Sequence, residues 1–130
     1  MTRVGLDSKI VLIADDNEAI RLLVSATLTS DRYSVLEATD GDEAWRLIHQ
    51  HHPSVAILDW EMPGYEGLEL AAVIKGDPQL RDMTVILLTA RGDPADREAA
   101  ERAQADLYLI KPFSPQELLS AVERALGLSA

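Results

Sequence analysis

Five short apolar runs alternate along the chain with longer segments in which apolar residues recur at helical spacing. The runs comprise residues 10–14, 33–38, 55–58, 85–88 and 107–110. Most of them are continuous, which is typical of strands buried on both faces of a parallel sheet. The run at 33–38 alternates more, as expected of an edge strand. The alternation predicts five consecutive strand–helix units, with right-handed crossovers that place helices on both faces of one sheet.

The intervening segments carry helix signals. Apolar positions between residues 20 and 28 fit one face of a helix. Helix starts are marked by Asp40, by Asp93 before a proline, and by Ser114, which opens a capping box with proline at the first helical position. We therefore predict an α/β fold, a doubly wound five-stranded parallel sheet with (βα)5 connectivity.

Length and charge narrow the class of protein. The chain has 130 residues, which suits one domain, so we expect residues 1–130 to form a single domain without an output domain. Lys and Arg number 12 and Asp and Glu 22, a net charge of −10, which argues against direct binding to nucleic acid or to an anionic membrane. The absence of Cys excludes disulfides, thiolate metal sites and cysteine nucleophiles. No apolar run approaches the ~20 residues of a membrane span and no signal peptide is evident, so we expect a cytoplasmic protein.

Polar residues stand directly after four of the apolar runs. Asp15 and Asp16 follow the first run, Asp59 the third, Thr89 the fourth and Lys111 the fifth. The carboxyl ends of parallel strands meet at one edge of a sheet, where such folds collect their functional groups. One carboxylate there could be a helix cap, but three carboxylates, a hydroxyl and an ammonium are hard to explain by capping alone.

The charges of this group suggest its chemistry. Three carboxylates and Lys111 sum to −2, and clustered carboxylates repel unless a cation joins them. The available ligands are all oxygen, which favours Mg²⁺ and brings the sum to zero. A phosphoryl group can then be accommodated, with Mg²⁺ and Lys111 neutralising its oxygens, Thr89 donating a hydrogen bond and a carboxylate attacking as the nucleophile.

These residues lie in motifs of a known family. The motifs are Asp15-Asp16, Asp59-Trp60-Glu61-Met62-Pro63-Gly64, Thr89-Ala90 and Tyr108-Leu109-Ile110-Lys111-Pro112-Phe113. With them the chain resembles, over essentially its whole length, a receiver domain of the response-regulator family of two-component signalling. For the α/β fold this resemblance implies the flavodoxin-like strand order 2-1-3-4-5. The stretch that begins at Asp59 is similar to that of stand-alone chemotaxis regulators.

The resemblance implies a phosphorylation site. Asp59 would accept a phosphoryl group from the phosphohistidine of a histidine kinase or phosphotransfer protein. Asp16 and Asp59 would ligate Mg²⁺ by carboxylate, Asp15 through water, and Glu61 through its backbone carbonyl. The protein would assist its own phosphorylation and dephosphorylation without being an enzyme otherwise.

The resemblance also implies a switch. Lys111 would pair with Asp59 and later with a phosphoryl oxygen, aimed by a cis bond before Pro112. Thr89 would move toward the phosphoryl group, and Tyr108 would swing inward to fill the space released. The surface of the fourth helix, fifth strand and fifth helix would change and bind an unknown downstream protein, the chain being a monomer or a phosphorylation-dependent dimer.

Four positions carry further expectations. Gln104 stands where the family usually has Gly, so we expect it either to adopt a left-handed conformation at a cost on the order of 1 kcal/mol or to end the fourth helix differently. Trp60 is expected to be partly exposed beside the site. Glu61 and Arg91 are hypothesised to form an ion pair across the mouth of the site and to slow hydrolysis, against the alternative of two solvated side chains.

Other functions remain open. An aspartate-nucleophile phosphohydrolase needs a second acid two residues after the nucleophile, where this chain has only the longer Glu61. A pseudo-receiver would keep the site residues but act only as a binding scaffold. A flavodoxin-like cofactor binder would need a Ser/Thr/Gly-rich phosphate loop after the first strand, which is absent.

Overall fold

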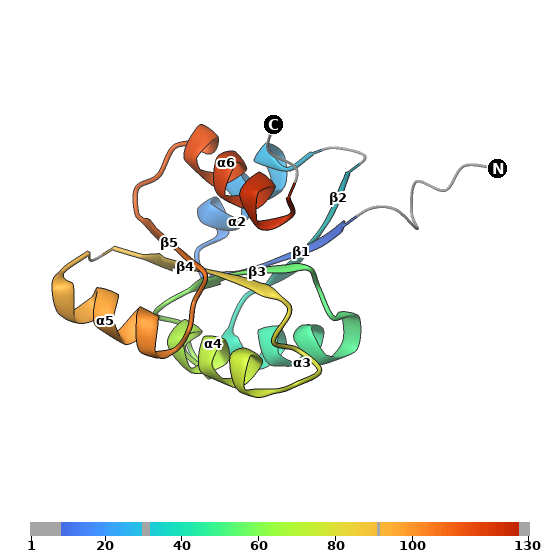
Figure 1. Cartoon of the computed structure of the whole chain (residues 1–130). Helices are drawn as coiled ribbons and strands as arrows, with labels where there is room; N and C mark the ends of the chain where they lie inside the picture. Colours follow the sequence, from blue (N-terminus) through green and yellow to red (C-terminus); the bar gives the residue numbers. More distant parts are fainter. Residues whose placement is uncertain (1–8, 30–31, 91, 128–130) are drawn as a thin grey trace.

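The computed structural model describes residues 9–29, 32–90 and 92–127, and its centre is a five-stranded parallel sheet (Figure 1). The strands follow the order β2-β1-β3-β4-β5. Their bounds are β1 Lys9–Ala14, β2 Tyr33–Ala38, β3 Val55–Asp59, β4 Thr84–Thr89 and β5 Leu107–Ile110. All four pairings are parallel. The predicted strand order is confirmed, including the edge position of the alternating run.

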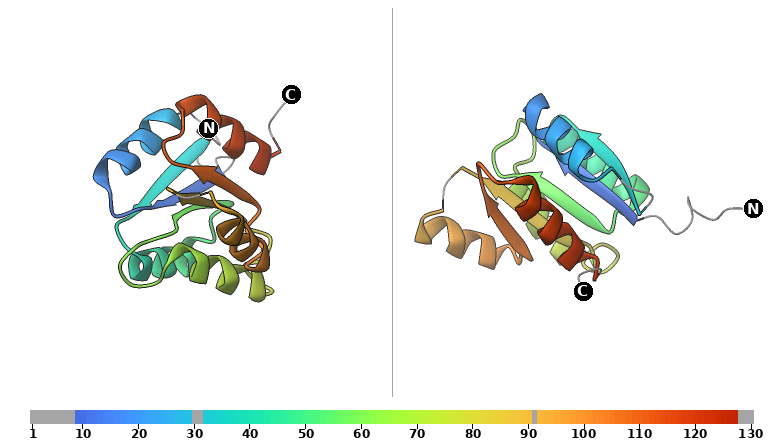
Figure 2. Two further views of the ribbon diagram at one scale, coloured as in Figure 1. Left: turned by 90° about the vertical axis from the view of Figure 1, so that its left-hand side faces the viewer. Right: turned by 90° about the horizontal axis from the view of Figure 1, so that it is seen from above.

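Five helices connect the strands and cover both faces of the sheet. They are α2 Glu18–Thr27, α3 Gly41–His51, α4 Gly67–Gly76, α5 Pro94–Arg102 and α6 Pro115–Ala125. Helices α2 and α6 lie on one face and α3, α4 and α5 on the other, as Figure 2 shows from two further directions. None of these helices, in the part of the chain that is described, has the length and apolarity needed to cross a bilayer.

The central strand β1 explains why the apolar runs are continuous. Val11 and Ile13 pack against α2 and α6, whereas Leu12 and Ala14 pack on the opposite face, and all four are fully buried. Successive side chains of a strand point to opposite faces, so a strand covered on both sides needs apolar residues at every position. Polar residues can first appear where such a strand leaves the covered part of the sheet, at its carboxyl end, and the predicted functional residues lie at that end.

Side-chain caps start the helices where the sequence predicts. Asp40 accepts a 2.8 Å hydrogen bond from the backbone N–H of Glu43, and Asp93 accepts one of 2.9 Å from Asp96. Ser114 accepts a 3.0 Å hydrogen bond from Glu117, whose carboxylate accepts one of 2.9 Å from the Ser114 N–H, which completes the predicted capping box.

Helix α5 ends through a left-handed residue that is not glycine. Gln104 has a φ of 64°. The N–H of Ala105 donates to the carbonyl of Ala100 at 3.1 Å, and that of Gln104 to Glu101 at 3.0 Å. This pair of bonds is the Schellman motif, in which glycine is favoured at the position of Gln104. The first of the two predicted outcomes is therefore confirmed: the glycine geometry is kept, at the cost of a side chain in the left-handed region.

Candidate functional site

The carboxyl edge of the sheet brings three predicted carboxylates together. Asp15 and Asp16 directly follow β1, and Asp59 is the last residue of the adjacent strand β3. One carboxylate oxygen from each lies within 4.8 Å of the others. Asp15 is fully buried, Asp59 is 7% exposed, and Asp16 is exposed.

Lys111 holds two of these carboxylates. Its Nζ donates to Oδ2 of Asp15 at 2.9 Å and to Oδ1 of Asp59 at 3.0 Å. The backbone N–H of Lys111 donates to the Thr89 carbonyl at 2.7 Å, which continues the β4–β5 pairing beyond β5. The peptide bond between Lys111 and Pro112 is cis, as predicted.

Asp15 is fixed at every polar atom. Its N–H donates to the Ala38 carbonyl at 3.1 Å, and its own carbonyl accepts 2.8 Å from the guanidinium of Arg21. Oδ1 accepts a 2.9 Å hydrogen bond from the backbone N–H of Asn17, and Oδ2 accepts from Lys111. This role of Arg21 was not predicted from the sequence. The feature that could have indicated it is a cation one turn inside the helix that follows the acidic pair.

The pKa values of Asp59 and Lys111 are both raised, for different reasons. Burial raises the pKa of Asp59 to about 6, with the hydrogen bond from Lys111 opposing this rise and the charge of Asp15 adding to it. Burial alone would lower the pKa of Lys111, but hydrogen bonds to Asp15 and Asp59 and their charges outweigh it and raise that pKa. The site therefore holds more negative charge than one ammonium compensates.

The donor set fits a magnesium ion. The clustered ligands are carboxylate oxygens, one of them on an exposed side chain that can reach an ion still carrying water. Burial is the largest cause of the raised pKa of Asp59, and the charges of Asp15 and Asp16 add to it; a bound divalent cation would favour the ionised carboxylate against both effects. Glu61 follows Asp59 by two residues, and its side chain does not belong to the carboxylate cluster of the described residues, which leaves its backbone as the candidate ligand.

The two predicted switch residues lie on neighbouring strands. Thr89 is 3% exposed at the end of β4, and Tyr108 is half-buried on β5. The ring of Tyr108 meets Trp60 edge-on, with centroids 6.3 Å apart at an interplanar angle of 82°.

The expectation for Trp60 was wrong. The side chain is only 8% exposed, because it packs in the core layer beneath α3, α4 and α5. Its backbone N–H donates to the Leu88 carbonyl at 2.8 Å, which carries the sheet pairing one residue past β3. Arg91 lies outside the described residues, so its ion pair with Glu61 stays a prediction.

Comparison with known proteins gives a consistent result. A family model described as the response regulator receiver domain matches residues 11–123. The chain is 42% identical over 116 residues to the probable transcriptional regulator ycf27 of Guillardia theta, covering 89% of this chain and 44% of that protein. It thus spans about half the length of that relative.

Two shorter proteins match along most of their length. A chemotaxis protein CheY homolog of Campylobacter jejuni is 37% identical over 119 residues, which cover 90% of this chain and 92% of that protein. The solved structure of the chemotaxis response regulator CheY4 of Vibrio cholerae superposes with a TM-score of 0.84 at 31% identity, covering 91% of this chain and 98% of that chain.

Proposed function

The chain belongs to the response regulator receiver domain family, and on that premise we propose that Asp59 accepts a phosphoryl group from the phosphohistidine of a histidine kinase or phosphotransfer protein. Members of this family act as phosphorylation-dependent signalling switches. The observation that carries the proposal is the cluster of the Asp15, Asp16 and Asp59 carboxylates at one edge of the sheet, two of which accept hydrogen bonds from Lys111. The proposal includes the cytoplasmic location expected from the sequence.

Asp59 is the best nucleophile of the three carboxylates. Both oxygens of Asp15 accept hydrogen bonds, and Asp16 is exposed to solvent. The described residues place Lys111 on Oδ1 of Asp59 and no donor on Oδ2. An oxygen of Asp59 attacks phosphorus, the bond to the histidine nitrogen breaks with its electron pair returning to the imidazole, and an acyl phosphate forms.

The neighbouring residues prepare the transfer. Asp15, Asp16, Asp59 and the backbone carbonyl of Glu61 would hold Mg²⁺, which when bound neutralises phosphoryl oxygens. Lys111 can shift its hydrogen bond from Asp59 to a phosphoryl oxygen while Asp15 keeps hold of it. The ammonium is therefore already placed beside the charge that develops during transfer.

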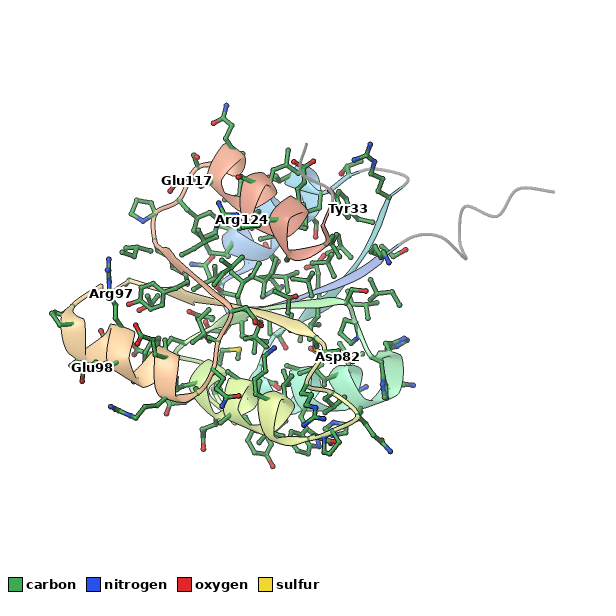
Figure 3. The ribbon with its side chains drawn as sticks, in the orientation of Figure 1. Tyr33, Asp82, Arg97, Glu98, Glu117 and Arg124 are labelled. Carbon is green, nitrogen blue, oxygen red and sulfur yellow. The ribbon has the colours of Figure 1, made fainter. Side chains whose placement is uncertain are left out.

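The proposed output surface is formed by α5, β5 and α6. Thr89 would move toward the phosphoryl group and Tyr108 would turn inward. Tyr108 borders two hollows of about 360 and 390 Å³ on the two sides of β5. The first is lined by Arg97 of α5 and the second by Glu117 and Arg124 of α6, side chains that Figure 3 marks. A downstream protein or a second copy of the chain would bind there.

The test is phosphorylation of the purified chain by a small phosphodonor with Mg²⁺, followed by intact mass and site mapping. We expect one phosphoryl group per chain, on Asp59. Asp59→Asn should abolish the gain and Asp16→Asn should raise the Mg²⁺ concentration required. Asp82→Asn is the matched control, because Asp82 is an exposed carboxylate just before β4, at the opposite edge of the sheet. Labelling that persists in Asp59→Asn, or none in the wild type, would refute the proposal.

The same preparation tests the alternatives. A phosphohydrolase needs the side chain of Glu61 in the site, whereas the carboxylate cluster of the described residues comprises Asp15, Asp16 and Asp59 without Glu61. Multiple turnover of a small phosphate ester would support such an enzyme, whereas a single labelled aspartate per chain supports a switch. A binding scaffold would take up no phosphoryl group with any donor. Size-exclusion chromatography with and without beryllofluoride separates a constant monomer from a phosphorylation-dependent dimer.

A further inference from the structure

A chain of polar contacts runs from the edge strand β2 to the backbone of the acidic pair. Nη1 of Arg21 donates to the carbonyl of Asp15 at 2.8 Å, and Nε of the same guanidinium lies 3.3 Å from Oε1 of Glu37. The hydroxyl of Ser25 donates to Oε2 of Glu37 at 3.1 Å. The side chain of Arg21 is 13% exposed and that of Glu37 44%. The cation is thus inside the fold, while its acidic partner is at the surface.

Local structure explains why Arg21 reaches this carbonyl. Helix α2 starts from the cap residue Asn17, and Arg21 lies one turn later, where its N–H donates to the Asn17 carbonyl at 3.2 Å. Helical side chains lean toward the amino end of their helix, so Arg21 points back at the junction between β1 and α2. Glu37 pairs with Ile13 in the sheet, two residues before Asp15, and so faces the same junction.

The contact completes the fixation of Asp15. With its carbonyl held by Arg21, all four polar atoms of Asp15 have partners. Asp16 is attached through the carbonyl carbon that carries this oxygen. The orientation of the peptide plane between Asp15 and Asp16 therefore sets the direction in which the exposed carboxylate of Asp16 leaves the strand. It also affects the position of the Asp15 carboxylate, which accepts a hydrogen bond from Lys111.

We propose that Arg21, oriented by Glu37, is a positioning residue for the magnesium and phosphoryl site. The inference rests on the function proposed above. Arg21 touches neither reacting group and acts through the backbone of Asp15. Groups that orient metal ligands from outside typically contribute about 10- to 100-fold to metal affinity or activity, and Arg21 occupies such a place relative to the acidic pair.

Positioning and simple charge predict opposite results. Arg21 is a cation near a site for a divalent cation, so a purely electrostatic role would make its removal strengthen Mg²⁺ binding. Removing the negative charge of Glu37 would then weaken binding. If Arg21 acts by holding the Asp15 carbonyl, its removal weakens binding despite the favourable change in charge.

Replacing Arg21 with lysine further separates a positioning role from a purely electrostatic role. The guanidinium reaches Glu37 and Asp15 with two different nitrogen atoms in one plane, and a single ammonium cannot reproduce that fork. Arg21→Lys keeps the charge and loses the geometry. Glu37→Gln keeps an oxygen that can accept from Nε and loses the charge.

The experiment compares Arg21→Met, Arg21→Lys and Glu37→Gln with the wild type. The control is Arg102→Met, which removes an exposed cation of α5 whose carboxylate partner Glu98 lies 3.9 Å away on the surface. Mg²⁺ dissociation constants come from titration calorimetry. Hydrogen exchange of the Asp15 and Asn17 amides is measured with EDTA present, relative to amides of β4. Urea unfolding reports global stability separately.

We expect Arg21→Met and Arg21→Lys each to weaken Mg²⁺ binding at least about 10-fold. Both should accelerate exchange at Asp15 and Asn17 more than at β4. Glu37→Gln should weaken binding by no more than about fivefold, the size of one neutral hydrogen bond. Arg102→Met should match the wild type.

Three outcomes would overturn the inference. They are Mg²⁺ binding in Arg21→Met that equals or exceeds that of the wild type, Mg²⁺ binding in Arg21→Lys that matches the wild type, and hydrogen exchange that accelerates uniformly with global unfolding. If Arg21→Met does not fold, Arg21→Lys decides the question. A wild type that neither binds Mg²⁺ nor takes up a phosphoryl group would instead refute the proposed function, and the two failures are thereby distinguished.

Discussion

Replacing Asp59 with asparagine is expected to stabilise the metal-free protein, although it removes the proposed phosphoacceptor. The carboxylate of Asp59 is buried beside two others, and these conditions raise its pKa from 3.8 to about 6 despite the hydrogen bond from Lys111. A raised pKa means that the folded state disfavours the ionised carboxylate. An asparagine side chain fills nearly the same volume without charge, and its oxygen can still accept from Lys111.

The size of the effect follows from the pKa difference. The interval between 3.8 and about 6 corresponds to about 3 kcal/mol in the free energy of unfolding. The site opens to water at the edge of the sheet, where Asp16 is exposed, so screening reduces this value. We expect Asp59→Asn to raise the free energy of unfolding by about 1–2 kcal/mol at pH 7.5.

The pH dependence has a definite sign. Below pH 3.8 the carboxyl is protonated in both the folded and the unfolded state, and Asp59 costs no stability. As the pH rises toward 6, the unfolded state loses its proton first, so the wild type loses stability relative to the variant. Above pH 6 the difference is constant. At pH 5 the advantage of Asp59→Asn should be about half of that at pH 7.5.

Urea unfolding with EDTA at pH 5, 6 and 7.5 measures this advantage. The chain has a net charge of −10, so removing any carboxylate reduces the overall repulsion between negative charges. Asp82→Asn controls for this general effect, because it removes one exposed carboxylate. The reasoning fails if Asp59→Asn gains no more than Asp82→Asn at pH 7.5. It also fails if the gain is the same at pH 5 as at pH 7.5.

Three other substitutions or additions give further tests by urea unfolding. Mg²⁺ at 100 times its dissociation constant should stabilise the wild type by about 2.7 kcal/mol and Asp16→Asn much less; equal stabilisation of both would exclude the acidic cluster as the binding site. Gln104→Gly should stabilise the fold by about 0.5–1 kcal/mol, because Gln104 has a φ of 64°, and a loss of stability would show that its side chain contributes more than the strain costs. Tyr33→Phe should change stability by less than about 1 kcal/mol, because the buried hydroxyl has no hydrogen-bond partner in the described part of the chain; a larger loss would indicate a bound water.

Much of the fold and the acidic site could be predicted from local patterns. Continuous apolar runs identify strands covered on both faces, and parallel pairing puts their carboxyl ends at one edge. Those two rules place Asp15, Asp16 and Asp59 together without any knowledge of packing. For Gln104 the resemblance to a family that usually has Gly there left two outcomes open, a left-handed residue or a different helix end, and the structure shows the first.

Tertiary structure decided what depends on several elements meeting. Lys111 stands 96 positions after Asp15, yet its ammonium divides its hydrogen bonds between Asp15 and Asp59, and only the packed sheet sets those distances. Trp60 follows the strand end, where pattern reasoning expects exposure, but the layer of α3, α4 and α5 extends over it.

Arg21 gains its place only because α2 directs it at the backbone of one strand while the edge strand supplies Glu37. Periodicity along a chain fixes which face a residue occupies. The partners of a long polar side chain depend on angles and distances between elements, which are set by the packing of the whole core.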